Sequence, residues 1–142
     1  MTQNISEIMS KDVVTINFDQ SIQEAASLMK SYDIGSIPVV KNGQLVGIIT
    51  DRDITLRSTA SGKDSHISVK ECMSTNLTVA SPSTDPHEAA NIMAQHQIRR
   101  LPVVENGQIV GIVAIGDLAT ENIYENEAGE ALSEISEHHH NQ

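Results

Sequence analysis

Two stretches of the chain place short runs of Val, Ile and Leu on either side of a polar Asn-Gly pair. The first covers residues 37–48 and the second residues 101–112, and nine of their twelve aligned positions are identical. Asn-Gly suits a two-residue turn in which both central residues have positive φ. Each stretch therefore predicts a β-hairpin, with strands near residues 36–40 and 45–49 in the first copy.

An offset of 64 residues relates the two hairpins, and the same offset continues beyond them without a gap. Residues 1–64 and 65–128 share 18 identities, which are spread from Glu7 to Asp53 in the first copy. Such self-similarity at a fixed period indicates an internal duplication. The predicted division is a first repeat at residues 1–64, a second at residues 65–125, and an acidic, partly helical tail at residues 126–142.

Helical spacing of apolar residues precedes each hairpin. The first stripe follows Ser21, which forms a capping box with Glu24 and so predicts the start of a helix. The members of this stripe recur at i, i+3, i+4 and i+7, and they are Ile22, Ala25, Ala26 and Met29. Before the second hairpin, Asp85 followed by Pro86 predicts another helix start.

Weaker patterns complete the predicted order of elements. They indicate short helical turns at residues 5–9 and 69–73, strands at 13–16 and 77–80, a linker at 60–66, helices at 51–59 and 116–125, and an acidic helix at 127–136. Each repeat then contains strands and helices in the order β-α-β-β-α. The predicted fold class is α/β, with two small mixed sheets packed about a pseudo-twofold axis.

Charge and composition narrow the classes of partner. The net charge is −10, no Lys or Arg follows Arg100, and the aromatic residues number only three, so we expect no nucleic-acid binding. No apolar run approaches the roughly 20 residues of a membrane span, and the first ten residues lack the pattern of a signal peptide. With a single cysteine, the chain is expected in the cytoplasm and away from membranes.

At residues 47–53 the first hairpin continues into Gly-Ile-Ile-Thr-Asp-Arg-Asp. With the preceding Pro-Val-Val and the β-α-β-β-α order, this motif resembles a cystathionine-β-synthase (CBS) domain. Two in tandem resemble a Bateman module, and the resemblance runs from about residue 5 to residue 125. The chain is similar to stand-alone bacterial CBS-pair proteins, which carry no attached enzyme, channel or transporter.

The resemblance implies that an adenosine-containing ligand binds in the cleft between the two repeats. It implies ribose contacts from Thr50 and Asp53, whose hydroxyl and carboxylate belong to the matched motif. It also implies adenine contacts from the first strand and from the first strand of the hairpin, namely Val14, Thr15, Ile16, Ile37 and Pro38.

The second repeat departs from this pattern. It keeps the carboxylate as Asp117 but has Ala114 where the motif requires a hydroxyl, so any second site is expected to be weaker. Conversely, Arg99 and Arg100 stand where related modules often place basic residues on phosphates, and the first repeat has no basic residue there.

The same residues also have simpler interpretations. Thr50 and Asp53 fit a capping box that only starts a helix, and sequence alone does not separate this from ribose binding. Two functions therefore stay open: a sensor of cellular energy or stress that binds an adenine nucleotide, and a ligand-free interaction module. A weaker third is redox or metal sensing through Cys72 and the histidines, including those at residues 138–140.

No Gly-rich phosphate loop, catalytic triad or paired-carboxylate pattern is present in the sequence, so we predict a regulatory protein and not an enzyme. We predict no metal site and no required cofactor, with the nucleotide acting as a regulatory ligand. A homodimer is expected through the helices that follow the hairpins, together with an unknown downstream protein partner.

Overall fold

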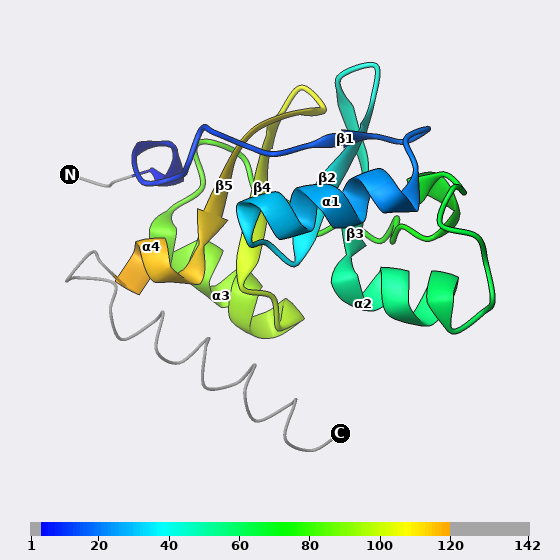
Figure 1. Cartoon of the computed structure of the whole chain (residues 1–142). Helices are drawn as coiled ribbons and strands as arrows, with labels where there is room; N and C mark the ends of the chain where they lie inside the picture. Colours follow the sequence, from blue (N-terminus) through cyan, green and yellow to red (C-terminus); the bar gives the residue numbers. More distant parts are fainter. Residues whose placement is uncertain (1–3, 120–142) are drawn as a thin grey trace. The chain divides into compact units, whose positions relative to one another are not determined.

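The computed structural model describes residues 4–119, which form two compact units (Figure 1). One unit is Val14–Leu77, and the other combines residues before Val14 with residues after Leu77. The α/β class is confirmed within these residues, and the order helix, strand, strand, helix recurs in both repeats. The predicted acidic tail at residues 126–142, with its helix at 127–136, lies outside the described part of the chain.

The unit Val14–Leu77 is built on three strands. Strand β1, Ile16–Asn17, runs parallel to β2, Ser36–Lys41, and β2 pairs antiparallel with β3, Gln44–Thr50. Its helices are α1 at Ile22–Tyr32, α2 at Asp51–Asp53, the π-helix η2 at Ile54–Thr59 and the 3-10 helix η3 at Val69–Glu71.

The predicted local signals explain these elements. The turn between β2 and β3 has φ of 52° at Asn42 and 81° at Gly43, as the Asn-Gly pair requires. Helix α1 begins after Ser21, whose hydroxyl accepts from the N–H of Glu24 at 3.1 Å. The buried residues of α1 are Ile22, Ala25 and Met29, whereas Ala26, which was predicted to belong to the buried stripe, is exposed.

The second unit has the same kind of hairpin between two helices, but its described residues include no counterpart of strand β1. It contains the 3-10 helix η1 at Ile5–Glu7, α3 at Pro86–His96, β4 at Arg100–Glu105, β5 at Gln108–Ala114 and α4 at Ile115–Ala119. Strands β4 and β5 form the predicted hairpin. Asp85 caps α3 by accepting from the N–H of His87 at 2.8 Å, and Pro86 occupies the first turn.

Four predicted elements have other bounds or another form in the structure. The strand expected at residues 13–16 is the two-residue β1, and that at 77–80 is wrong, because only Ala80 makes a bridge, with Val103. Ala80 exchanges both backbone hydrogen bonds there, with the carbonyl of Pro102 and the N–H of Val104. The helix expected at 51–59 is α2 followed by η2, and the helix expected to reach residue 125 is described only as α4.

Two short segments, which we call straps, explain why the compact units differ from the sequence repeats. The first strap, residues 5–10, belongs to the unit of the second hairpin, where Ser10 bridges Ile112. The second strap, residues 69–74, belongs to the unit of the first hairpin, where Ser74 bridges Ile48. Each compact unit therefore takes its strap from the other sequence repeat.

Both straps contribute to hydrophobic cores. Val69 and Cys72 of the second strap are fully buried together with Ile16, Ile37 and Ile49. In the other unit, Ile5 of the first strap is buried with residues of α3, β4 and β5. Burial of these apolar side chains stabilises each strap on its unit.

Candidate functional site

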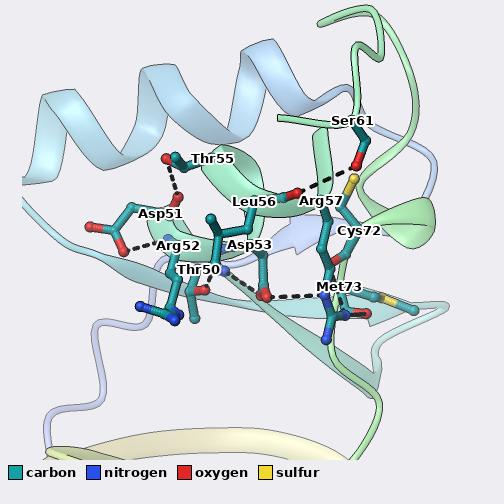
Figure 2. Close-up of polar contacts among 10 residues, drawn as sticks. All are labelled: Thr50, Asp51, Arg52, Asp53, Thr55, Leu56, Arg57, Ser61, Cys72 and Met73. Atoms are coloured by element: carbon teal, nitrogen blue, oxygen red, sulfur yellow. Dashed lines mark hydrogen bonds and ion pairs between the residues drawn. The ribbon is translucent and has the colours of Figure 1, made fainter. Parts of the chain in front are cut away.

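The junction between β3 and α2 is organised by Thr50 and Asp53 (Figure 2). The N–H of Asp53 donates to the Thr50 hydroxyl at 3.0 Å, and the N–H of Thr50 donates to Asp53 Oδ2, also at 3.0 Å. This is a complete capping box. The capping interpretation of the two residues is therefore confirmed, and their role toward a ligand stays a prediction.

The capping box leaves acceptor capacity on the Asp53 carboxylate. A carboxylate has about four lone-pair sites, and the Thr50 N–H uses one of them on Oδ2. Oδ1 lies 3.7 Å from Arg57 Nε in an ion pair, and the Asp53 side chain is 15% exposed. A vicinal diol presents two hydroxyl donors that one carboxylate can accept, so capping and ribose binding are chemically compatible.

The residues predicted to contact adenine fall into two groups. Val14 and Thr15 are half-buried, so their side chains are partly accessible. Ile16, Ile37 and Pro38 are buried, and the two isoleucines belong to the hydrophobic core. Among the five residues, only Val14 and Thr15 therefore have partly accessible side chains, a distinction that the sequence pattern did not reveal.

In the other unit the structure gathers Arg99, Arg100 and Asp117 around the start of α4. Arg100 lies opposite Ala114 in the β4–β5 ladder, and the N–H of Ile115 donates to the carbonyl of Arg99 at 2.8 Å. The N–H of Ala114 donates to Asp117 Oδ2 at 2.8 Å. Half of the capping box is thus retained, and the half that needs a hydroxyl is missing.

The ten predicted residues are divided between the units. Arg99, Arg100 and Asp117 lie in the unit of the second hairpin, and the remaining seven lie in Val14–Leu77. Both arginines are exposed. A single site that combines Thr50 and Asp53 with the two arginines therefore stays a prediction from the family resemblance.

Two surface hollows were not predicted. One, of about 320 Å³, lies over α2 and η2 and is lined by Asp51, Arg52, Thr55 and Leu56. The other, of about 800 Å³, lies along α1 and includes Leu28 and Tyr32 among its lining residues. Leu56 and Tyr32 are large apolar side chains that are 48% and 58% exposed.

Arg57 is the polar residue near the junction that sequence reasoning missed. Besides its ion pair with Asp53, its guanidinium donates to backbone carbonyls of the second strap (Figure 2). The available signal was its spacing, since residues four apart on a helix lie side by side. The predicted helix at residues 51–59 placed Arg57 four residues after Asp53.

The third hypothesis, redox or metal sensing, concerns Cys72 and the histidines. Between residues 4 and 119, no three His, Cys, Asp or Glu side chains lie together as a metal site requires. Cys72 is buried in the core, and this burial raises the pKa of its thiol. The histidines at 138–140 lie outside the described residues.

No helix within residues 4–119 is long and apolar enough to span a bilayer.

Comparison with known proteins identifies both repeats. A family model described as CBS domain matches residues 5–58 and 69–123. The CBS domain-containing protein YhcV of Bacillus subtilis is 50% identical over 133 residues, which cover 94% of this chain and 95% of YhcV.

Two solved structures are similar over most of the chain. Hypoxic Response Protein I, solved with two coordinated zinc ions, has a TM-score of 0.77 at 30% identity and covers 84% of this chain and 98% of its own. The CBS domain pair of protein MJ0100, solved with 5-methylthioadenosine and S-adenosyl-L-methionine, has a TM-score of 0.73 at 29% identity. That match covers 89% of this chain and 99% of the MJ0100 pair.

Proposed function

The chain belongs to the CBS-domain family, whose pairs are regulatory ligand-binding modules, and we propose that it binds an adenine nucleotide and signals its occupancy to a protein partner. The observation that carries the proposal is the Thr50–Asp53 box at the end of β3. Its partly exposed carboxylate keeps lone pairs for a ribose diol after the cap has formed. The adenosine compounds bound to the MJ0100 pair support the ligand class.

The proposal gives each predicted residue a role. Thr50 and Asp53 bind the ribose, and exposed Arg99 and Arg100 bind phosphate oxygens, for which guanidinium groups are well suited. Asp117 belongs to a second, weaker site, because Ala114 supplies no hydroxyl. Adenine is held by Val14, Thr15, Ile16, Ile37 and Pro38.

The proposed protein is a non-catalytic homodimer of the cytoplasm. Exposed Leu56, on the helix after the first hairpin, supports a self-association surface, since apolar side chains exposed on a helix favour contact with a partner. Light scattering at micromolar concentration tests the dimer, and a monomeric mass would refute it. The downstream partner is a protein whose chemistry the chain does not specify.

A ligand-free interaction module is the second candidate. The observation that favours it is that the capping box already accounts for the Thr50 and Asp53 contacts without any ligand. The two candidates differ in one measurable property, namely whether the purified protein carries or takes up a nucleotide.

A thermal-shift titration with AMP, ADP, ATP, S-adenosylmethionine and NAD tests the proposal. A ligand present at 100 times its Kd adds roughly 2.7 kcal/mol of stability, which raises the Tm by several degrees. We expect this shift to vanish in Asp53→Ala. It should persist in Asp51→Ala, a matched control that removes an exposed carboxylate from the same helix.

Asp53→Ala also removes a cap, so its own Tm is lower and only the ligand-induced change in Tm is compared. Isothermal titration calorimetry then gives the Kd of each variant. No shift with any of the five compounds, on protein free of bound nucleotide, would support the interaction module. Equal nucleotide affinity in wild type and Asp53→Ala would refute the assigned site.

A further inference from the structure

The Arg57 side chain connects the candidate ribose-binding carboxylate with the second strap, residues 69–74. Its Nε lies 3.7 Å from Asp53 Oδ1. Its Nη1 donates to the carbonyls of Cys72 and Met73, each at 3.4 Å (Figure 2). The Arg57 guanidinium thus contacts both the candidate site and the second strap. Arg57, Asp53, Cys72 and Met73 all belong to the unit Val14–Leu77.

The second strap is also held by the burial of Val69 and Cys72 and by backbone hydrogen bonds. Ser74 and Ile48 exchange two backbone hydrogen bonds of 2.8 and 2.9 Å, and the N–H of Val69 donates to the carbonyl of Gln20 at 2.8 Å. Between these two ends, the carbonyls of Cys72 and Met73 accept from Arg57. Arg57 is the side chain that hydrogen-bonds the strap between these ends, so we expect it to contribute to the order of the strap.

The ion pair between Arg57 and Asp53 is weak. Its side chain is 55% exposed, and its ion pair with Asp53 is long at 3.7 Å. A long ion pair to an exposed arginine contributes little, because ordering the long Arg57 side chain costs entropy. A ligand that fixes the Asp53 carboxylate removes part of this entropy cost in advance, so Arg57 keeps its bonds to the strap for more of the time.

We propose that Arg57 couples occupancy of the Asp53 carboxylate to the order of the second strap, so that a bound adenosine ligand stabilises residues 69–74. The inference rests on the proposed function, because it requires a ligand at Asp53. Coupling of this kind is reciprocal, so an ordered strap also raises the affinity for the ligand. The strap carries two exposed charges, Lys70 and Glu71, so a change in its order alters a surface that a partner protein can contact.

The first strap, residues 5–10, provides an internal control. Ser10 and Ile112 exchange the same pair of backbone hydrogen bonds, at 2.8 and 2.9 Å. At the offset of 64 residues, however, the sequence has Glu121 in place of Arg57. A carboxylate cannot donate hydrogen bonds to carbonyls. Ligand binding at Asp53 should therefore leave the first strap unchanged.

Hydrogen–deuterium exchange of the full chain, read by mass spectrometry, tests the coupling. The variants are wild type, Arg57→Ala and the matched control Arg52→Ala, which removes an exposed arginine from the same helical segment. Without ligand, we expect peptides of residues 69–74 to exchange about twofold to fivefold faster in Arg57→Ala than in the other two proteins.

The same proteins are then saturated with whichever of AMP, ADP, ATP, S-adenosylmethionine and NAD gives the largest thermal shift. We expect slower exchange of residues 69–74 in wild type and Arg52→Ala, no such change in Arg57→Ala, and no change of residues 5–10 in any of them. Arg57→Lys keeps the charge but lacks the fork that spans a carboxylate and two carbonyls. It should fold like wild type and lose the ligand-dependent protection.

The outcomes separate the two proposals. If a ligand binds and Asp53→Ala abolishes the binding, but exchange of residues 69–74 stays constant or becomes faster, the coupling is wrong and the proposed function stands. Equal ligand-dependent protection in wild type, Arg57→Ala and Arg57→Lys overturns the coupling in the same way. If none of the five compounds binds, the proposed function fails, and the coupling fails with it.

Discussion

Gly47 of β3 is a position where one added carbon should be damaging. A Cβ built there lies 2.6 Å from Met73 Sδ, 3.0 Å from Met73 Cγ and 2.9 Å from the backbone oxygen of Ser74. All three atoms belong to the second strap. Gly47 does not have a left-handed φ, so its backbone conformation is one that alanine adopts readily. The effect of Gly47→Ala should therefore come from the clash with the strap.

The size of this effect follows from what the strap would lose. Replacing Gly by Ala at a compatible position gains about 0.4–1 kcal/mol. Overpacking costs about 1–3 kcal/mol, and displacing the strap weakens two backbone hydrogen bonds between Ile48 and Ser74, worth about 1 kcal/mol each. We expect a net destabilisation of about 2–3 kcal/mol, which lowers the Tm by about 6–9 °C for a chain of this size.

Urea and thermal unfolding of the purified variant measure this loss. Met73→Ala in the Gly47→Ala background removes the clashing side chain and leaves only the Ser74 oxygen within 3 Å, so the double-mutant cycle should show favourable coupling. The control is Gly116→Ala, which meets no heavy atom within 4 Å and should leave the free energy of unfolding unchanged or raise it by about 0.5 kcal/mol. A Gly47→Ala protein as stable as wild type would refute the described packing of the strap.

Three further predictions concern local chemistry. Ala114→Thr supplies the hydroxyl missing from the second capping box, in which the N–H of residue 114 already donates to Asp117. The Tm should rise by about 2–4 °C, and an unchanged or lower Tm would contradict this prediction. Burial raises the pKa of the Cys72 thiol and limits access to it. Alkylation by iodoacetamide at pH 8 should therefore be at least about tenfold slower in the native protein than in urea. Equal rates would exclude a buried thiol. The pKa of Asp64 lies below its ordinary value of 3.8, chiefly because its carboxylate accepts a hydrogen bond from the backbone N–H of His66 and secondly because it contacts the His66 side chain. This interaction stabilises the folded state above pH 3.8, and the stabilisation is lost as pH falls through the folded pKa. A titration of the Asp64 carboxyl by NMR should give a pKa below 3.8, and a value at or above 3.8 would show that the His66 contacts are absent in solution.

The elements that the sequence predicted correctly are those with local causes. The hairpins depend on Asn-Gly turns, and the starts of α1 and α3 depend on Ser21 and Asp85, whose side chains contact residues two or three positions away. Each of these signals lies inside the element that it determines. The junction at Thr50 was predicted for the same reason, since its capping partner is three residues away.

The elements that were missed depend on distant parts of the chain. The pairing of Ser10 with Ile112 leaves no periodic pattern in either segment, so nothing in the sequence revealed that the straps join opposite repeats. The repeated Met and Gly positions were visible, but only the structure places the side chain of Met73 over Gly47. The contacts of Arg57 with the second strap were missed for the same reason, because Cys72 and Met73 lie 15 and 16 residues away.

The position of the straps gives the two units different folding histories. The second strap follows its partner Ile48 by about 26 residues, so the unit Val14–Leu77 closes through short loops once residue 77 has left the ribosome. The first strap is synthesised at the start but closes a loop of about 100 residues when it reaches Ile112. During translation the first strap therefore lacks its partner until β5 has been made, and we expect the unit that contains Thr50 and Asp53 to form first.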